Sequence, residues 1–101
     1  MNKNEVDEIA SAQALFTLLS GRTRLLILRH LWDGEVSVGG IAAATGLREA
    51  AVSQQLALLR KECVVVARRD SQKIYYSIAC DEVRRVLGAV GGIFSVTHDR
   101  P

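Results

Sequence analysis

The stretch that decides the fold reads Gly46-Leu47-Arg48-Glu49-Ala50-Ala51-Val52-Ser53-Gln54-Gln55-Leu56-Ala57-Leu58-Leu59-Arg60-Lys61. On a 3.6-residue period, Val52, Leu56 and Leu59 share one face, which predicts a helix that packs by that face. The opposite face carries short polar groups and alanines, where a solvated helix would carry long charged side chains: Glu49, Ala50, Ser53, Gln54 and Ala57. This second face is therefore shaped for close approach to another surface.

The chain has 101 residues, enough for one small domain, and we expect 1–101 to be a single domain with 98–101 as a disordered tail. A chain of this size in which 49% of the residues are apolar favours burial shared between subunits. The formal net charge is +2, but it is unevenly spread. Residues 1–20 hold one cation against three anions, whereas residues 48–73 hold six cations against three. The basic character is therefore local to the deciding helix and the segment after it.

The two cysteines are too few for a disulfide framework, and no CxxC motif is present. The N-terminus is polar and acidic, unlike a cleavable secretion signal. No apolar run approaches the length needed to span a bilayer. We therefore expect a cytoplasmic protein without membrane contact.

Four elements are predicted before the deciding helix. Apolar residues at helical spacing predict helices over 4–20 and 22–32, separated by Ser20-Gly21. A short strand comes next at 35–37, and Ser37 then N-caps a helix that ends at Thr45-Gly46. The last of these helices and the helix at 48–61 are joined by a few residues that include glycine. This arrangement is a helix-turn-helix.

Beyond Lys61 the pattern becomes strand-like. Residues 64–67 and 73–78 predict a β-hairpin whose polar turn at 69–72 is basic. A final helix is expected from Asp81, its N-cap, to about Val96, with three glycines along one stripe where a partner helix approaches closely. The predicted fold is mainly α with a small β-hairpin: a winged helix-turn-helix with an extra helix at each end.

Four segments together resemble the ArsR/SmtB family of small dimeric bacterial repressors: 18–28, 36–42, 47–59 and 68–77. The resemblance covers roughly residues 12–95. The hairpin and last helix are most similar to the branch that contains NolR, HlyU and BigR, whose members are not the usual metal sensors. The resemblance implies a homodimer joined through the first and last helices, and repression by binding a near-palindromic DNA operator. The expected interface residues are Leu15, Leu18, Gly88, Gly91, Gly92 and Phe94.

In this family the helix at 48–61 reads DNA, and its usual sequence is Leu-Ser-Gln-Ser, a small or apolar pair, then Ser-Gln-His-Leu. Ser53 and Gln54 match this pattern and carry over as base or phosphate contacts. Arg48 replaces a serine N-cap but offers a cation to a phosphate. Glu49 replaces an amide with a carboxylate that only accepts hydrogen bonds, for instance from cytosine N4. Ala50 and Gln55 also depart from the pattern, so we expect an operator unlike the family's common one.

The hairpin, or wing, places three cations around its turn. A basic hairpin tip has two interpretations: charge that protects an edge strand, or contacts to phosphates and the minor groove. Its position beside a reading helix favours the second. The full predicted set of DNA-binding residues is Arg48, Glu49, Ala50, Ser53, Gln54, Gln55, Arg60, Lys61, Arg68, Arg69, Gln72 and Lys73.

We expect no metal, no cofactor and no enzymatic activity. Where relatives carry Cys-x-Cys in the third helix, this chain has Ser37 and Gly39. The metal-binding pattern of the family's last helix is replaced by Asp81, Glu82 and Arg84, and the histidines at 30 and 98 are isolated. No Ser/His/Asp cluster, phosphate-binding glycine loop or HExxH motif is present.

Cys63 and Cys80 remain to be explained. Cys63 occupies a position where the family usually has Gly or Asn and where a left-handed backbone is common. If Arg69 faces Lys73, residue numbers across the hairpin sum to about 142, which places Cys63 opposite Ala79 or Cys80. Either two inert thiols or a reversible disulfide that alters DNA affinity would fit this placement of the cysteines.

Two rival functions stay open: a regulator with a thiol or ligand signal, and a winged-helix module that binds proteins without reading DNA.

Overall fold

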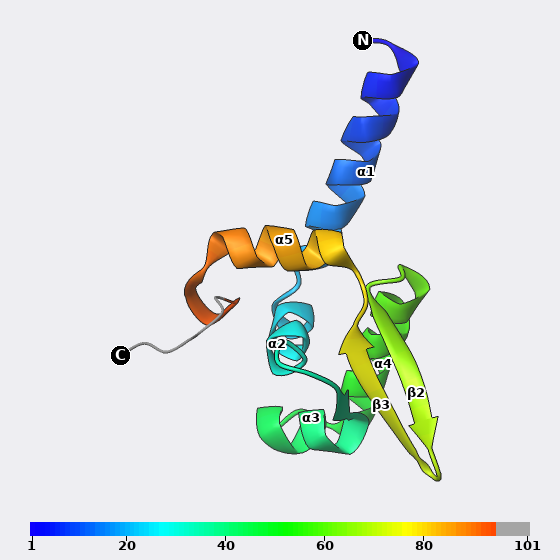
Figure 1. Cartoon of the computed structure of the whole chain (residues 1–101), viewed down its shortest axis with the longest axis vertical. Helices are drawn as coiled ribbons and strands as arrows, with labels where there is room; N and C mark the ends of the chain where they lie inside the picture. Colours follow the sequence, from blue (N-terminus) through cyan, green and yellow to red (C-terminus); the bar gives the residue numbers. More distant parts are fainter. Residues whose placement is uncertain (95–101) are drawn as a thin grey trace.

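The computed structural model describes residues 1–94, so the predicted tail at 98–101 lies outside the described residues. The elements come in the predicted order (Figure 1): α1 (Lys3–Leu19), α2 (Arg22–His30), β1 (Val36–Ser37), α3 (Val38–Thr45), α4 (Glu49–Lys61), β2 (Val65–Asp70), β3 (Lys73–Ile78) and α5 (Asp81–Val90). The predicted winged helix-turn-helix is confirmed.

The three strands form one antiparallel sheet in the order β1-β3-β2. Asp70 pairs with Lys73 and Arg69 with Ile74, so the predicted pairing of Arg69 with Lys73 is wrong by one residue. The reason is the turn: β2 runs on to Asp70 and leaves a two-residue turn in which Ser71 takes a φ of 58°. Glycine usually occupies such a position, so the sequence pattern concealed the tighter turn.

The core forms between α2, α3, α4, the start of the wing and α5. Val52, Leu56 and Leu59 of α4 are fully buried, as their helical spacing predicted. The other fully buried large side chains come from α2, α3, α5 and the residue after α2: Ile27, Leu28, Leu31, Ile41 and Val83. The face of α4 opposite this core is consequently left for contacts outside the domain.

Helix α1 extends away from the rest of the molecule (Figure 1). A capping box begins it: Asn2 Oδ1 accepts from the Glu5 backbone N–H at 2.8 Å, and Glu5 Oε1 accepts from the Asn2 N–H at 3.0 Å. Leu15, Leu18 and Leu19 near its C-terminal end pack on the core. Figure 1 shows α1 at one end of the molecule and the tip of the wing at the other.

Helix α5 is shorter than predicted and ends at Val90 instead of about Val96. Gly91 and Gly92 have φ values of 76° and 63°, which turn the chain into a 3-10 segment over Gly92–Phe94. The prediction that they share a helical stripe with Gly88 is therefore wrong, since only Gly88 of the three lies in α5. The N-cap is Cys80, not the predicted Asp81, which is the first helical residue.

Candidate nucleic-acid interface

The turn between α3 and α4 is fixed by local hydrogen bonds. Ser37 Oγ accepts from the Gly40 N–H at 3.0 Å, so the predicted N-cap of α3 is confirmed. At the other end, Gly46 takes a φ of 78° and donates to the Ala42 carbonyl. Thr45 Oγ1 accepts from the Leu47 N–H at 3.2 Å. These bonds set the direction in which α4 leaves the turn.

The outer face of α4 is exposed, as its composition predicted. The exposed residues at its N-terminal half are Arg48, Glu49, Ala50, Ser53 and Gln54. Arg48 occupies the N-cap without a side-chain cap bond, because a guanidinium has no acceptor atom, and its side chain is exposed. Short side chains along this face allow the helix backbone to approach a groove closely.

A hollow of about 520 Å³ lies between the first turn of α3, the first turns of α4 and the tip of the wing. Four predicted DNA-binding residues line it together: Glu49, Ser53, Gln72 and Lys73. A Cβ atom on Gly39 would lie 3.6 Å from Glu49 Oε2, so the carboxylate lies beside the N-terminus of α3. A negative charge is favourable at that end of a helix. Helix α4 and the tip of the wing thus form one surface.

Two of the residues predicted to contact DNA, Gln55 and Lys61, lie on a different side of α4 from Ser53 and Gln54. Gln55 is half-buried, and its Oε1 accepts from Arg24 Nη1 at 3.2 Å, while Arg24 Nε donates to the Leu18 carbonyl. Lys61 lines a second hollow, of about 470 Å³, that α1 borders. The helical period of α4 already placed Gln55 beside the apolar stripe, and this signal separates it from Ser53 and Gln54.

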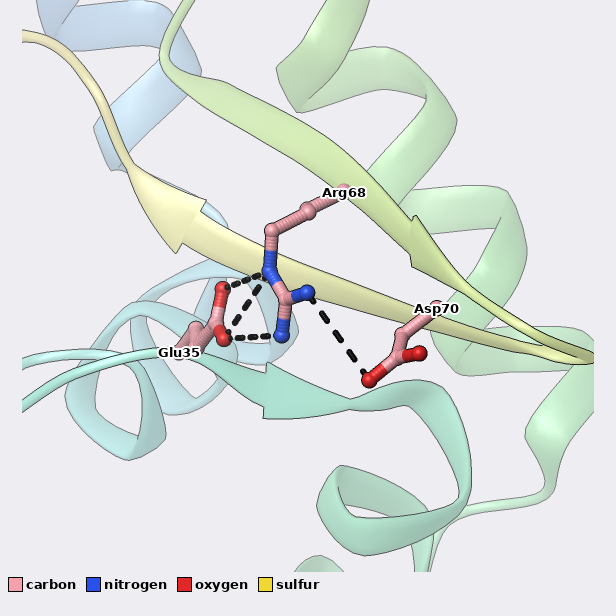
Figure 2. A network of polar contacts seen from close by, with 3 residues as sticks. All are labelled: Glu35, Arg68 and Asp70. Atoms are coloured by element: carbon pink, nitrogen blue, oxygen red, sulfur yellow. Dashed lines mark hydrogen bonds and ion pairs between the residues drawn. The ribbon is translucent and has the colours of Figure 1, made fainter.

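The cations of the wing differ in their surroundings. Arg69 and Lys73 are exposed and form no ion pair within residues 1–94. Arg68, by contrast, binds the Glu35 carboxylate through Nε and Nη2, with Nε 3.1 Å from each oxygen (Figure 2). Hydrogen bonding from Arg68 lowers the pKa of Glu35 below its ordinary value, and the same bond raises the pKa of Arg68.

Sequence reasoning missed the role of Glu35, which it placed only at the start of a short strand. The contact depends on β3 lying between β1 and β2. Alternation along a strand could have placed Glu35 and Ser37 on one face, but the partner on β2 follows only from the strand order.

The two cysteines flank the hairpin. Cys63 has a φ of 63°, which confirms the expected left-handed backbone. Its N–H donates to the Arg60 carbonyl and the Val64 N–H donates to Leu59, the two bonds of a Schellman motif. The last paired residues at this end of the hairpin are Val65 and Ile78, and the Ala79 N–H donates to the Val64 carbonyl just beyond them. The predicted placement of Cys63 opposite Ala79 or Cys80 stays a prediction, because a left-handed residue does not continue a strand register. Cys63 is exposed, Cys80 is half-buried, and both are free thiols.

Two findings bear on other classes of site. No group of three His, Cys, Asp or Glu side chains within residues 1–94 is arranged to hold a metal ion. Over the same residues, no helix combines the length and apolar character required to cross a membrane.

Comparison with known proteins identifies the family. The profile described as "Bacterial regulatory protein, arsR family" matches residues 21–65. The nodulation protein NolR of Rhizobium meliloti is 41% identical over 97 residues, which are 96% of this chain and 78% of NolR. The transcriptional activator HlyU of Vibrio cholerae is 34% identical over 88 residues, 86% of this chain and 82% of HlyU. A biofilm growth-associated repressor of Agrobacterium fabrum is 36% identical over 85 residues, 84% and 73% of the two chains.

Solved structures agree with this assignment. The crystal structure of NolR from Sinorhizobium fredii matches with a TM-score of 0.81 at 38% identity, covering 89% of this chain and 90% of that one. A homodimeric winged helix-turn-helix DNA-binding domain from Mycobacterium bovis, solved by NMR, matches with a TM-score of 0.77 at 31% identity, covering 89% and 83%. This chain belongs to the ArsR family of winged helix-turn-helix proteins. It is a DNA-binding transcriptional regulator and not an enzyme.

Proposed function

We propose that this chain is a homodimeric repressor that acts in the cytoplasm by occupying a near-palindromic operator. The observation that carries the proposal is the common surface of α4 and the wing, where Ser53, Gln72 and Lys73 surround one hollow. Relatives include both an activator and a repressor. Repression requires only that a promoter be occupied, so the binding surface alone is sufficient for it.

Uncovered apolar side chains on α1 support the homodimer. Val6, Ile9 and Phe16 are 47%, 57% and 60% exposed, and their spacing places them along one side of the helix. A row of large exposed apolar side chains is typical of an interaction surface. Val90 near the end of α5 is 74% exposed as well. Phe94 of the predicted interface set is instead buried, with its ring centroid 5.2 Å from that of Trp32.

Two-fold symmetry then sets the form of the operator. Each protomer contributes one α4, and the two copies would enter major grooves on half-sites about 34 Å apart. We assign base contacts to Ser53 and Gln54, and phosphate contacts to Arg48, Arg69 and Lys73, whose cations are exposed. Because each cation counts twice in the dimer, binding should weaken steeply with salt.

A gel-shift titration tests the proposal directly. The probe is the chain's own promoter region, and the competitor is the same DNA with one half-site scrambled. The expected result is a dimer complex on the intact site that survives at higher salt than the complex on the scrambled site. Equal binding to both DNAs at every salt concentration would contradict the proposal and favour a winged-helix module that binds proteins.

The location of both cysteines at the open end of the hairpin favours a second candidate, a thiol-responsive regulator. Hydrogen peroxide would accept two electrons from Cys63 and Cys80, which would form one S–S bond as the peroxide is reduced to two water molecules. The disulfide would lock the end of α4 to the start of α5 and alter operator affinity. Free thiols and operator affinity are measured before and after peroxide treatment, with Cys80→Ser as the control. Unchanged thiol content or unchanged affinity in the native chain would exclude this signal.

A further inference from the structure

Glu35 lies outside the reading surface, yet it is bonded to the wing. It directly precedes β1, and its carboxylate accepts from Nε and Nη2 of Arg68 on β2. Because β3 lies between these strands, the pair links the two outer strands of the sheet across the middle one (Figure 2). The backbone continues from β1 straight into α3. The ion pair therefore connects the helix-turn-helix to the outer strand of the wing.

The guanidinium of Arg68 is engaged on several sides. It lies 5.1 Å from the centroid of the Tyr75 ring, and its Nη1 is 3.9 Å from Asp70 Oδ2. Two carboxylates thus compensate its charge, and a DNA phosphate would have to displace them. Arg69 is the next residue, so its side chain leaves the opposite face of the sheet, where it has no ion pair within residues 1–94.

We propose that Glu35 and Arg68 form a clamp that holds the wing at a fixed angle to α3, so that both are positioning residues for DNA binding. Arg68 is then not a phosphate contact, and the cations that the clamp presents to DNA are Arg69 and Lys73. This inference rests on the proposed operator binding. The side chains of Glu35 and Arg68 are 38% and 54% exposed, and exposed ion pairs are weak, so we expect an effect of about twofold to fivefold on operator affinity.

The first test asks whether removal of the Glu35 charge raises or lowers operator affinity. Glu35→Gln removes a negative charge near a polyanion, so long-range electrostatics alone predicts tighter operator binding. The clamp predicts binding that is about twofold to fivefold weaker. Asp33→Asn is the matched control, because it makes the same charge change two residues away on a side chain that is 89% exposed. Its affinity should be equal to that of the native chain or higher. Fluorescence anisotropy with labelled operator measures all three.

The second test separates geometry from charge. Arg68→Lys keeps the cation but loses the planar fork that binds both carboxylate oxygens. The clamp predicts that this variant weakens binding as much as Glu35→Gln does, that the double variant is no weaker than either single one, and that the charge swap Glu35→Arg with Arg68→Glu restores affinity. A phosphate contact predicts the reverse: Arg68→Lys binds normally, and the swap binds worst.

The salt dependence of operator binding gives a third test. Loss of a phosphate contact lowers the slope of log affinity against log salt by about 0.9 per contact, hence about 2 for a dimer. Arg68→Gln should leave that slope unchanged. A lowered slope together with tighter binding by Glu35→Gln would overturn the clamp. Failure of the native chain to distinguish its operator from scrambled DNA would instead overturn the proposed function, which keeps the two failures distinct.

Discussion

The half of the chain that we propose to face DNA (α3, α4 and the wing) differs from the half formed by α1 and α5 in the kind of side chain that it exposes. In the first half, exposed side chains are mostly short or charged, and some are held by neighbours within the chain, as Glu35 holds Arg68. In the second half, Val6, Ile9 and Phe16 of α1 have large exposed apolar areas. The first half exposes two large apolar side chains on separate elements, Leu58 of α4 and Val66 of β2, whereas the second exposes a row of them on one helix, the kind of surface that a partner covers.

Breaking the apolar row of α1 should give the largest effect. We expect Phe16→Glu to convert the dimer to a monomer, because a buried unpaired carboxylate at the interface is strongly unfavourable. Operator affinity should fall by about a hundredfold or more, since two linked half-site contacts become one. Sedimentation and a gel shift measure the two effects.

Phe16→Leu is the matched control, because it changes the same side chain but keeps it apolar. This variant should leave both assembly and affinity unchanged. If Phe16→Glu remained a dimer with native affinity, the division of the chain into two halves would be wrong.

Glu49→Gln probes the reading surface with the next largest effect. An amide can pair with adenine, whereas a carboxylate only accepts, so base preference should shift at one position of each half-site by about 1–3 kcal/mol. We expect this shift to exceed any change in overall affinity. Selection from a library of randomised operators measures the preference of both proteins.

The position of Glu49 beside α3 also defines the result that would contradict this prediction. If its carboxylate stays near Gly39 in the complex, Glu49→Gln would bind every DNA more tightly with unchanged base preference. That result would make Glu49 a repulsive group and not a reader.

Lys73→Ala tests whether the wing and α4 act as one surface. The variant should bind operator and unrelated DNA more weakly by the same factor, because a phosphate contact is independent of sequence. The salt slope should fall by about 2 for the dimer. Lys61→Ala is the control: it removes the same charge from the side of α4 near α1, and its slope should change less.

The two halves also differ in how far the sequence predicted them. The periodicity of Val52, Leu56 and Leu59 and the glycine after α3 were enough to predict helix α4 and its exposed face. The end of α5 was not predictable in this way, because Gly91 and Gly92 fit a helical stripe as well as a turn, and only the packing of Phe94 on Trp32 distinguishes the two. Long-range contacts such as that of Glu35 depend on strand order, which local patterns do not contain.

A substitution at the end of α4 should have the smallest effect, and it should leave DNA binding and dimerisation unchanged. Helices α3 and α4 both end with a left-handed residue, Gly46 after α3 and Cys63 after α4, with φ values of 78° and 63°. A left-handed backbone costs a residue with a Cβ roughly 1–2 kcal/mol. A glycine avoids this cost, but its greater freedom in the unfolded chain cancels part of the gain in stability.

Cys63 is exposed, so little packing is lost with its thiol. We therefore expect Cys63→Gly to raise the free energy of unfolding by about 0.5–1 kcal/mol, measured by urea denaturation, with operator affinity unchanged. Cys63→Ala removes the same thiol but keeps the Cβ, so it should not stabilise the protein. If Cys63→Gly were instead less stable than Cys63→Ala, the strain of the left-handed backbone at this helix end would be smaller than the cost of glycine's greater conformational entropy in the unfolded chain.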